Sequence, residues 1–551
     1  TAELLRAGHV VAVKGLGGYH LAADATSEAA TAALRSRKHR VDKPFAVMVP
    51  TPEHARALCQ VDAVADELLG DRRAPIVLLD RRDPESDPIA PSVAPGTREL
   101  GLMLPYTGLH HLLLAETGTP LVLTSGNVAD EPIAFRDDDA LARLSGIADA
   151  LLTHDRPIHT RVDDSVVRPW RGGALPVRRS RGYAPAPITC AWEFPRPVLA
   201  CGAELKNTVC LARDRRAVCS HHIGDLEDAG TLAAFTEAIA HLGRLFDTTP
   251  DVVAHDLHPE YLSTKYALDR DDVETVGVQH HHAHIAACLA DNGVDGPVIG
   301  VAFDGTGYGT DGTIWGGEFL LATLAGFERV GHFGPVPMPG GTAAVRQPWR
   351  MAAAYLRDVA DADLGELPVV RRDERRWGQV RALARSGVHA PPTSSAGRLF
   401  DAVAAVLDLR EVVTYEGQAA IELEQRAERS HPGSYPVPVS EELIVDVTAL
   451  VRAVVDDRLR GTDPGVIAAR FHNSLVSVVT RVCAAVSDRT GVRRVALSGG
   501  VFGNRLLADR TVAALERAGM MVLTHTRVPC NDGGISLGQA AVVGARDRAA
   551  G

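Results

Sequence analysis

The sequence predicts an α/β protein with two principal domains. Short apolar runs such as Val10–Lys14 alternate with helical runs such as Ser27–His39 in the first part of the chain, and the alternation returns after a proline-rich stretch. A chain of 551 residues is also longer than a single hydrophobic core usually serves. We therefore place domains at residues 1–186 and 197–551, joined by a linker at residues 187–196.

The first domain is predicted from short strands and connecting helices that follow one another closely. Apolar runs of strand length, bounded by turn residues, occur at Val10–Lys14, Phe45–Val49, Ile76–Leu79 and Leu121–Leu123. The helical run Ser27–His39 begins with serine, a residue that favours helix N-termini. The pattern is typical of an α/β domain.

The second domain repeats this pattern and carries an insertion. Its predicted strands and helices are Val198–Cys201, Val209–Ala212, helix 231–246, Val298–Phe303, helix 465–489, Arg494–Leu497, helix 504–518, Met520–Leu523 and helix 534–548. Residues from roughly 340 to 460 contain more helical and fewer strand patterns, and we expect a helical insertion there.

Composition excludes several classes of protein. A net charge of −11 argues against general nucleic-acid binding, and we expect no nucleic-acid partner. The sequence has neither an apolar run of membrane length nor a pattern of the signal-peptide type, so we expect no membrane association. The eight cysteines form no Cys-x-x-Cys pair, which fits reduced thiols in the cytoplasm.

A cluster of histidines is the first candidate site. Four histidines occur between His280 and His284, before an apolar helical run. His280 and His284 are four residues apart, so on a helix they point the same way and can bind one metal ion. A polar helix start with solvated histidines is the alternative for such a pair taken alone. The rest of the chain must supply further ligands.

Three strand ends in the second domain carry glycine-rich turns. Asp304 ends a buried strand and is followed by the spaced glycines Gly305, Gly307 and Gly309. Such a turn presents a carboxylate and open backbone N–H groups to a phosphate or its metal. A plain hairpin is the alternative.

The second glycine-rich turn, with Gly499 and Gly500, follows Ser498 and leads to a helix beginning at Asn504, an arrangement suited to anions. Asp532 lies in the third and is by itself an ordinary helix cap. With His280, His284 and Asp304 it completes a two-histidine, two-carboxylate set for a divalent ion.

Two further segments of the second domain offer groups for a ribose. The helical run that starts near Ser395 contains Asp401, and the loop Tyr415–Gln418 contains Gly417. Alone, each segment also fits an ordinary helix cap or loop. Beside a phosphate site they become candidates for binding the sugar of a nucleotide.

A run of cations marks the candidate site of the first domain. Lys38, Arg40 and Lys43 precede an apolar strand, where their charges would line the edge of a sheet. Ser125 and Asn127 follow another strand and offer hydroxyl and amide donors, and the Arg178–Arg181 segment, which includes Arg179, adds charge. These groups could clamp a triphosphate, although the chain has no Walker loop. A solvated helix end is the alternative for the basic run.

The sequences of these motifs resemble those of the HypF family of carbamoyltransferases, which serves [NiFe]-hydrogenase maturation. The resembling segments span nearly the whole chain: Lys14–Leu21, Thr124–Asn127, His154–Ile158, Asp163–Arg168, Gly202–Asn207, His222–Glu227, His255–Pro259, the histidine cluster, Phe303–Gly309, Trp315–Phe319 and Asn531–Gly538. The resemblance implies a YrdC-like open twisted-sheet domain followed by a two-lobed domain of actin-like ATPase fold similar to TsaD.

The resemblance also implies roles for individual residues. By likeness to TsaD, His280, His284 and Asp532 bind a metal, Asp304–Gly309 bind substrate, and Asp401, Gly417 and Asn504 contact a nucleotide; Asp304 joins the metal ligands by likeness to HypF. By likeness to YrdC, the segments Lys38–Pro44, Ser125–Asn127 and Asp164–Ser165 bind ATP. The candidates for catalysis are Lys14, His281 and His282, and either histidine would face the adenylate or the incoming thiol.

The implied reaction proceeds in two steps. The first domain joins carbamate to ATP, with Mg²⁺, and forms carbamoyl-adenylate and pyrophosphate. The second domain, with one divalent ion (Fe²⁺, Zn²⁺ or Mn²⁺), passes the carbamoyl group to the C-terminal cysteine of HypE, where it becomes a cyanide ligand. The family usually begins with acylphosphatase and zinc-finger regions, which this sequence lacks. We therefore expect it not to release carbamate from carbamoyl phosphate by itself.

Three other functions stay open at this stage. A small-molecule O-carbamoyltransferase uses related domains, but in the opposite order. A tRNA-modifying fusion protein is disfavoured by the negative net charge of the chain. A nucleotide-binding scaffold without turnover is disfavoured by the complete set of candidate metal ligands.

Overall fold

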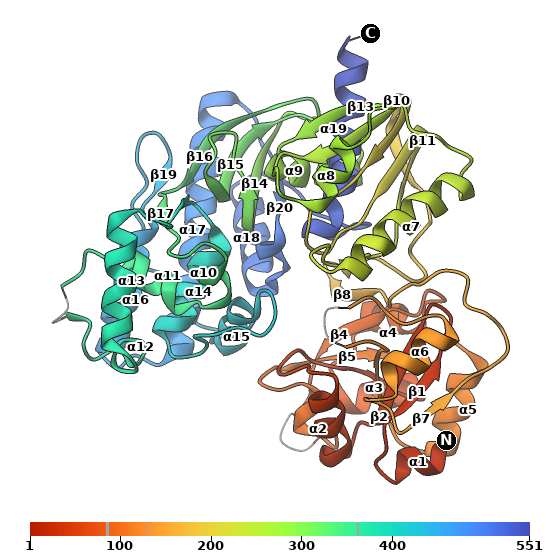
Figure 1. The fold of residues 1–551 in the computed structure, drawn as a ribbon. Helices are drawn as coiled ribbons and strands as arrows, with labels where there is room; N and C mark the ends of the chain where they lie inside the picture. Colours follow the sequence, from red (N-terminus) through yellow and green to blue (C-terminus); the bar gives the residue numbers. More distant parts are fainter. Residues whose placement is uncertain (84–86, 129–130, 361–362, 551) are drawn as a thin grey trace. The chain divides into compact units, whose positions relative to one another are not determined.

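The computed structural model describes residues 1–83, 87–128, 131–360 and 363–550, and divides the chain into two compact units. Unit 1 contains Thr1–Thr189, Arg196–Asp251 and Thr526–Pro529, and unit 2 contains Cys190–Pro195, Val252–His525 and Cys530–Gly551. Helices and strands alternate in both units, as the sequence predicts (Figure 1). Among the described residues, no helix combines the length and apolar character needed to cross a membrane.

Unit 1 is built on a mixed sheet of nine strands in the order β7-β1-β2-β6-β3-β5-β4-β8-β9. The strands are β1 (Val11–Lys14), β2 (Tyr19–Asp24), β3 (Ala46–Met48), β4 (Ile76–Asp80), β5 (Glu99–Met103), β6 (Leu121–Ser125), β7 (Ala150–Leu152), β8 (Val166–Trp170) and β9 (Gly173–Arg178). The helices are α1 (Ala2–Arg6), α2 (Glu28–Arg37), α3 (Pro52–Leu58), α4 (Ala63–Gly70), η1 (Pro91–Val93), α5 (Gly108–Thr117) and α6 (Asp137–Leu144).

Two hydrophobic clusters cover the two faces of this sheet. Alternate residues of β2 separate between them: Leu21 and Ala23 join one cluster, whereas Ala22 joins the other. This is the two-residue period of a strand buried on both faces. The first cluster includes residues of α2, α3, α4 and α6, and the second includes residues of α1 and α5.

Residues 187–196, expected to form a linker, lie almost entirely in the long strand β10 (Ile188–Ala200). Ile188, Cys190 and Phe194 are buried, and exposed residues lie between them. This alternation favours a strand, and Pro195 occupies one of its exposed positions. The prolines that indicated a break therefore do not interrupt the strand. Unit 1 also contains β11 (Cys210–Cys219) and α7 (Ala229–Leu245).

Unit 2 is organised around a sheet of eight strands, in which β17-β18-β15-β14-β20-β21 are neighbours and β16 pairs with β15 and β19. The strands of this sheet are β14 (Val298–Tyr308), β15 (Ile314–Ala322), β16 (Phe327–Phe333), β17 (Val336–Pro337), β18 (Pro392–Thr393), β19 (Ile444–Val445), β20 (Arg494–Ser498) and β21 (Met521–Leu523), whereas β12 (Val252–Asp256) and β13 (Glu274–Val278) lie outside it. Strands β12 and β13 pair in parallel.

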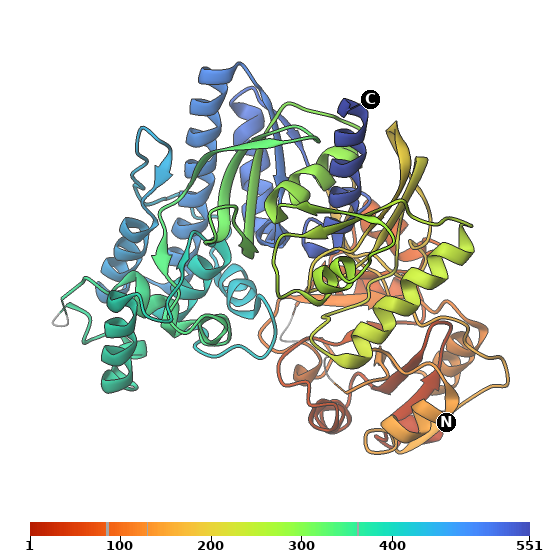
Figure 2. The ribbon, with the colours of Figure 1, turned by 45° about the horizontal axis from the view of Figure 1, so that its top comes forward.

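The helices of unit 2 pack around these strands. They are α8 (Leu262–Leu268), α9 (His280–Asn292), α10 (Thr342–Arg346), α11 (Trp349–Tyr355), α12 (Pro368–Arg371), α13 (Glu374–Ser386), α14 (Ala396–Val406), α15 (Gln418–Arg426), α16 (Val447–Leu459), α17 (Pro464–Thr490), η3 (Gly500–Gly503), α18 (Arg505–Arg517), η4 (Asp532–Gly534) and α19 (Ile535–Ala550). Helix α9 contacts β14, β15 and β20, and α19 packs along α9 (Figures 1 and 2). Residues 340–460 carry helices α10 to α16.

Candidate metal centre and nucleotide sites

The histidine cluster forms the first turn of α9, a helix whose every residue from His280 to Asp291 is buried. Gln279 caps this helix, because its Oε1 atom accepts a hydrogen bond from the His282 N–H group. Gly293, with φ 66°, ends it in the left-handed conformation. A helix this deeply buried, beginning with four histidines, needs polar partners for their rings.

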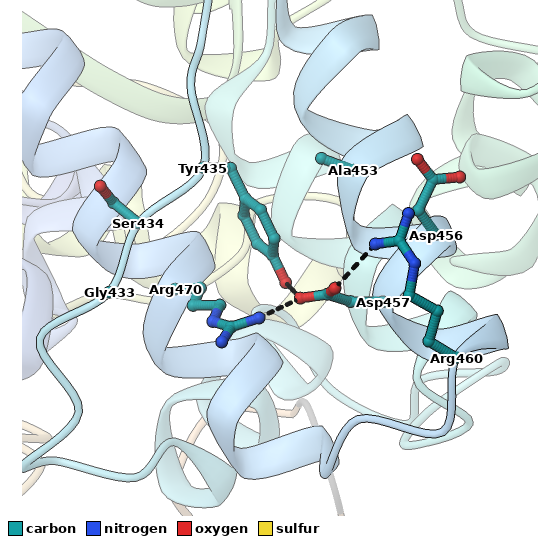
Figure 3. A pocket seen from close by; sticks show the side chains of 8 residues that line it. All are labelled: Gly433, Ser434, Tyr435, Ala453, Asp456, Asp457, Arg460 and Arg470. Atoms are coloured by element: carbon teal, nitrogen blue, oxygen red, sulfur yellow. Dashed lines mark hydrogen bonds and ion pairs between the residues drawn. The ribbon is translucent and has the colours of Figure 1, made fainter.

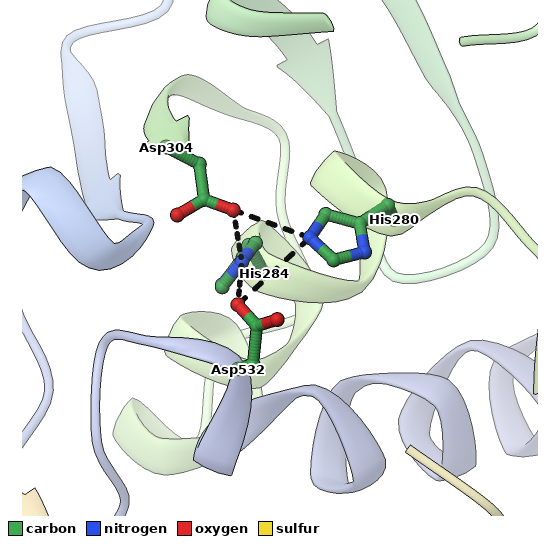
Figure 4. Close-up of side chains that lie close together, drawn as sticks. All are labelled: His280, His284, Asp304 and Asp532. Carbon is green, nitrogen blue, oxygen red and sulfur yellow. Dashed lines mark hydrogen bonds and ion pairs between the residues drawn. The ribbon is translucent and has the colours of Figure 1, made fainter. Parts of the chain in front are cut away.

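His280, His284, Asp304 and Asp532 converge on one point in unit 2 (Figure 4). Asp304 Oδ2 lies 3.2 Å from His280 Nε2 and 3.4 Å from His284 Nε2. Asp532 Oδ1 lies 4.0 Å and 3.5 Å from the same two nitrogens. One ligand atom from each residue therefore falls within 4.8 Å of the others, a spacing that suits a single divalent cation.

Asp256, which was not a predicted site residue, binds the ring nitrogen of His280 that faces away from Asp304 and Asp532. Its Oδ2 atom lies 2.8 Å from His280 Nδ1, and both side chains are fully buried. The parallel pairing of β12 with β13 places Asp256 beside Val278, two residues before His280. A carboxylate on the far nitrogen fixes the tautomer of a metal-binding histidine and raises its basicity. The signal available in the sequence was the end of the strand at His255–Asp256.

Charge balance within the cluster opposes the cost of burial. Burial lowers the pKa of His280, but Asp256, Asp304 and Asp532 together raise it well above its usual value. Burial raises the pKa of Asp304, but the two histidines bring it well below its usual value. His280 and Asp304 therefore stabilise each other's charged forms, and a bound cation would replace the proton on the imidazole.

His281 and His282 point to different surroundings. Gln279 Nε2 donates to the Tyr308 carbonyl at 3.0 Å and lies 3.2 Å from His281 Nδ1, so His281 Nδ1 is the acceptor and its Nε2 carries the proton. That Nε2–H group is buried and has no hydrogen-bond partner among the described residues. His282 Nε2 instead lies 2.8 Å from the Thr323 carbonyl, and its ring packs on Phe327.

The turn predicted after Asp304 is instead an irregularity within β14, which continues to Tyr308, and Gly307 explains part of its glycine spacing. A Cβ atom at this position would lie 2.5 Å from His281 Cε1 and 2.6 Å from His280 Cδ2, so a side chain cannot fit. The β14 segment thus passes directly over the two rings. Gly305, by contrast, has open space beside it, and Gly309 lies in the turn before Trp315.

The turn after β20 is anchored to the same centre. The Gly500 N–H group donates to Asp304 Oδ1 at 2.8 Å. Gly499 has φ 98°, and a Cβ atom there would lie 2.2 Å from the Phe303 carbonyl oxygen, so only glycine is compatible. Ser498 Oγ lies 2.8 Å from His525 Nε2, and His525 Nδ1 lies 3.9 Å from Asp291 Oδ2. This buried network links β20 to the end of α9.

The nucleotide candidates of unit 2 lie on the elements around this turn. Ser395, which caps α14, donates its hydroxyl hydrogen to the Gly305 carbonyl, and Asp401 lies on the same helix. Burial raises the pKa of Asp401 to about 6; Arg398 opposes the shift and Glu416 adds to it. Gly417 begins α15 with φ 74°.

Asn504 caps α18, and both the oxygen and the nitrogen of its side-chain amide have polar partners. Its Oδ1 atom accepts from the Leu507 N–H group, and its Nδ2 atom lies 2.9 Å from His472 Nε2. Asp401 and Asn504 are therefore carried by helices that begin next to the Gly305 and Gly500 backbone.

Unit 1 brings Lys38, Ser125 and Asn127 together. The Lys38 ammonium group donates to the Ser125 carbonyl at 2.8 Å, to the Asn127 carbonyl at 2.6 Å and to Asn127 Oδ1. Ser125 Oγ lies 2.9 Å from Asn127 Oδ1. Lys38 is buried, so this loop after β6 and the end of α2 form one polar centre.

The remaining candidates of unit 1 are held by the protein itself. Lys14 is buried and donates to Asp137 Oδ2 and to the His154 carbonyl, both at 2.9 Å. Arg179 donates to the carbonyls of Cys219, Tyr183 and Ala186, and Ser165 bridges Ser180 and Arg181. Arg40 donates to the carbonyls of Lys43 and Pro44, and Lys43 itself is exposed.

A second polar cluster lies beside Ser125; Asp164 and the Arg178–Arg181 segment were predicted to belong to the site, but the contact of Asp164 with His20 was not. His20 is opposite Ser125 in the pairing of β2 with β6, and its Nε2 atom lies 3.2 Å from Asp164 Oδ2. Arg181 donates to Asp164 Oδ1 at 2.8 Å and lies over the ring of Tyr106. Burial raises the pKa of Asp164, but His20 and Arg181 bring it below its usual value. The polar side chains of the candidate site in unit 1 therefore extend beyond Lys38, Arg40 and Lys43.

Comparison with sequence families defines the class of this protein. Residues 3–180 match a family described as Telomere recombination, which covers Sua5, YciO and YrdC. Residues 193–291 match the HypF Kae1-like domain, and residues 300–539 match the second subdomain of the Kae1-like domain of carbamoyltransferases. The fold and the site thus define an α/β enzyme with a YrdC-like part and a Kae1-like part.

Individual relatives then identify the family. The chain is 42% identical to carbamoyltransferase HypF of Synechocystis over 97% of its length and 71% of that protein. It is 41% identical to HypF of Rhizobium leguminosarum bv. viciae, over 98% of this chain and 70% of that protein. The chain belongs to the HypF family of carbamoyltransferases, as its motifs predict.

Solved structures agree with this assignment. A full-length HypF in a phosphate- and nucleotide-bound form matches with a TM-score of 0.96 and 40% identity, covering 99% of this chain and 86% of that chain. HypF of T. kodakarensis matches with a TM-score of 0.94 and 35% identity, covering 100% of this chain and 73% of that chain. The predicted enzyme class, a carbamoyltransferase, is confirmed.

The contact between Asp256 and His280 leads to a test of the metal centre. Replacing Asp256 with Asn removes the charge behind His280, so we expect the affinity for a divalent ion to fall about 10- to 100-fold. Competition with a chromogenic chelator measures this affinity, and thermal unfolding checks the fold. Asp272→Asn is the matched control, because Asp272 is an exposed carboxylate paired with Arg270. Equal affinities in the two variants would contradict the role of Asp256.

Proposed function

We propose that this chain makes carbamoyl-adenylate from carbamate and ATP in its YrdC-like part. Its Kae1-like part then transfers the carbamoyl group to the C-terminal cysteine of HypE, for the cyanide ligands of [NiFe]-hydrogenase. The observation that carries the proposal is the convergence of His280, His284, Asp304 and Asp532 beside the glycine turn of Gly500. The phosphate and nucleotide bound to the related HypF structure support the nucleotide part.

The first reaction needs cations and donors around a triphosphate. A carbamate oxygen attacks the α-phosphorus of ATP, the bond to the β-phosphate breaks, and pyrophosphate leaves with Mg²⁺. Lys38 is already fixed to the Ser125–Asn127 loop, so its charge is pre-positioned rather than mobile. Exposed Lys43 and half-buried Arg40 follow it directly and supply further positive charge at the same end of α2. Preorganised charge of this kind stabilises the charge that develops on phosphate oxygens.

The second reaction takes place at the metal centre of unit 2. We assign His280, His284, Asp304 and Asp532 as ligands of one divalent ion, Fe²⁺, Zn²⁺ or Mn²⁺, all of which this donor set suits. When bound, such an ion would act as a Lewis acid and would orient the adenylate. The β14 irregularity at Gly305 and the turn at Gly500 leave backbone near the phosphate, and Asp401, Gly417 and Asn504 are assigned to the adenosine.

His281 is the residue that we assign to the transfer step. Its Nε2–H group is a buried donor without a partner among the described residues, and it lies in the first turn of the ligand helix. We infer that it donates to the carbamoyl oxygen while the thiolate of HypE attacks the carbonyl carbon. The carbon–oxygen bond to AMP then breaks and AMP leaves, with the thiocarbamate on HypE. His282 is bonded to the Thr323 carbonyl instead, so we give it no part in transfer.

The cytoplasm is the proposed location of this reaction. All eight cysteines are buried and none forms a disulfide, a state that a reducing compartment preserves. A free thiolate on the acceptor protein requires the same conditions.

Labelling of HypE tests the proposed function directly. The chain, ATP, Mg²⁺ and ¹⁴C-carbamate should give AMP, pyrophosphate and label on HypE, because each transfer consumes one adenylate. HypE that lacks its terminal cysteine should stay unlabelled and serves as the control. Pyrophosphate release without any labelling of intact HypE would overturn the acceptor, and absence of both products would overturn the adenylation step.

A change at His281 should slow transfer without removing the metal. His281→Phe keeps a flat ring but lacks the N–H donor, and loss of one such donor costs about 10²- to 10³-fold in rate. His281→Gln restores a donor and should recover part of the rate. His282→Gln is the matched control, and single-turnover labelling of HypE measures all three. A similar loss of rate in His281→Phe and His282→Gln would contradict the assignment.

The raised pKa of Asp401 predicts a pH dependence of nucleotide binding. Above its pKa of about 6 the carboxylate is ionised and accepts a hydrogen bond from a ribose hydroxyl; as the pH falls through that value, it is protonated. Affinity for AMP should therefore fall about fivefold between about pH 7.5 and about pH 5, since bonds to charged groups are the stronger ones. Calorimetry should show a flatter profile for Asp401→Asn. Parallel profiles for the two proteins would contradict a role for Asp401.

A further inference from the structure

A cavity of about 620 Å³ lies along α17 and α18, outside the site described above. We call it the basic groove and define it by Asn473, Ser477, Thr480 and Arg481 of α17 and Arg510 and Arg517 of α18. The four α17 residues are spaced by four, three and one positions and the two arginines of α18 by seven, so each set lies on one helix face. The two helices pack against each other, and the groove runs between these faces.

The arginines of the basic groove donate hydrogen bonds to uncharged oxygen atoms of the protein. Arg510 donates to Asn473 Oδ1 and to the Arg429 carbonyl. Arg481 donates to the Val437 carbonyl at 2.8 Å, and Arg517 donates to the Ala513 carbonyl at 3.1 Å. In the part of the chain that the structure describes, none of the three forms an ion pair with a carboxylate. Asp509 also lines the cavity, but its carboxylate faces Arg505 at 3.6 Å.

The neighbouring pocket shows the opposite arrangement (Figure 3). It has a volume of about 290 Å³, and its arginines converge on one carboxylate, Asp457. Arg470 and Arg460 are both paired with Asp457, and Tyr435 donates to it at 2.8 Å. The charges of this pocket are thus neutralised within the protein, whereas those of the basic groove are not.

The position of Arg510 makes its uncompensated charge significant. Burial lowers the pKa of this guanidinium, because part of its hydration is lost. A partly desolvated cation without a counter-ion is costly unless an anion completes the site. The chain as a whole carries a net charge of −11, so a local cationic groove is an exception to its general character.

We propose that the basic groove binds a short acidic segment of a protein partner. Seven residues of helix span about 10 Å, so Arg510 and Arg517 are spaced for carboxylates about three residues apart in an extended peptide. Ser477, Thr480 and Asn473 provide neutral hydrogen-bonding groups between the charges. Charges spaced in this way along a helix match a peptide better than a single compact anion.

The groove also lies close to the proposed transfer site along the chain. Arg510 is six residues, or about 9 Å of helix, from Asn504, which begins α18 and is a nucleotide candidate. A protein held by its acidic segment would therefore be retained near the position where transfer is proposed. Peptide binding does not itself depend on the proposed function.

Fluorescence anisotropy with the whole chain tests the proposal. The probe is a short fluorescein-labelled peptide of consecutive Glu and Asp residues, compared with the same peptide carrying Gln and Asn. We expect only the acidic peptide to bind, and its affinity to fall as the salt concentration rises from about 0.05 M to about 0.3 M. Arg481→Glu/Arg517→Glu should weaken binding at least about tenfold, because two attractive charges become repulsive. Both arginines are exposed, so the fold should be retained.

A matched variant and a competitor complete the experiment. Arg375→Glu reverses an exposed arginine on α13, outside the groove, and should leave binding unchanged. Equal binding of the acidic and neutral peptides, or equal loss in the Arg375 and the groove variants, would overturn the proposal. Displacement of the peptide by inorganic phosphate or by single-stranded RNA at matched charge concentration would equally overturn it, because the groove would then recognise a different anion.

Discussion

The arrangement of unit 2 depends on one buried contact, between Asp256 and His280. The contact exists because β12 and β13 run parallel and end together, with Asp256 beside Val278, just before the histidine helix. Asp304 Oδ2 then lies 3.2 Å from the other ring nitrogen of the same imidazole, Nε2. Such a row of carboxylate, imidazole and carboxylate is stable only when each charge has a partner, so these side chains constrain the ends of three strands at once.

Glycines at two positions let these segments approach so closely. Gly499 permits the β20 turn to touch the backbone of Phe303, and Gly307 permits β14 to cover two imidazole rings. Both contacts replace side chains with backbone at the point where a phosphate is proposed to bind. The same principle of fixed polar groups on rigid elements appears in unit 1, where Lys38 is tied to the loop after β6.

The sequence does not show which basic side chains of this protein have partners inside the fold and which line a groove. Lys14 and Arg179 donate hydrogen bonds to carboxylate or carbonyl groups inside unit 1, although in sequence they resemble the other basic residues of its motifs. Arg481 and Arg517 belong to no motif, yet they line a groove without a carboxylate partner among the described residues. What separates them is the identity of their neighbours, which depends on how distant segments pack.

The sequence by itself determined the α/β class and most of the strands and helices, because hydrophobic period and helical spacing are local properties. Its motifs also carried the resemblance that identified the family and the four residues of the candidate metal site. Tertiary structure alone decided that Asp256 supports His280, that His281 and His282 diverge, and that residues 187–196 continue a strand. It also brought together His20, Asp164 and Arg181. Each of these depends on strand pairing or burial between residues far apart in the chain, which no local pattern encodes.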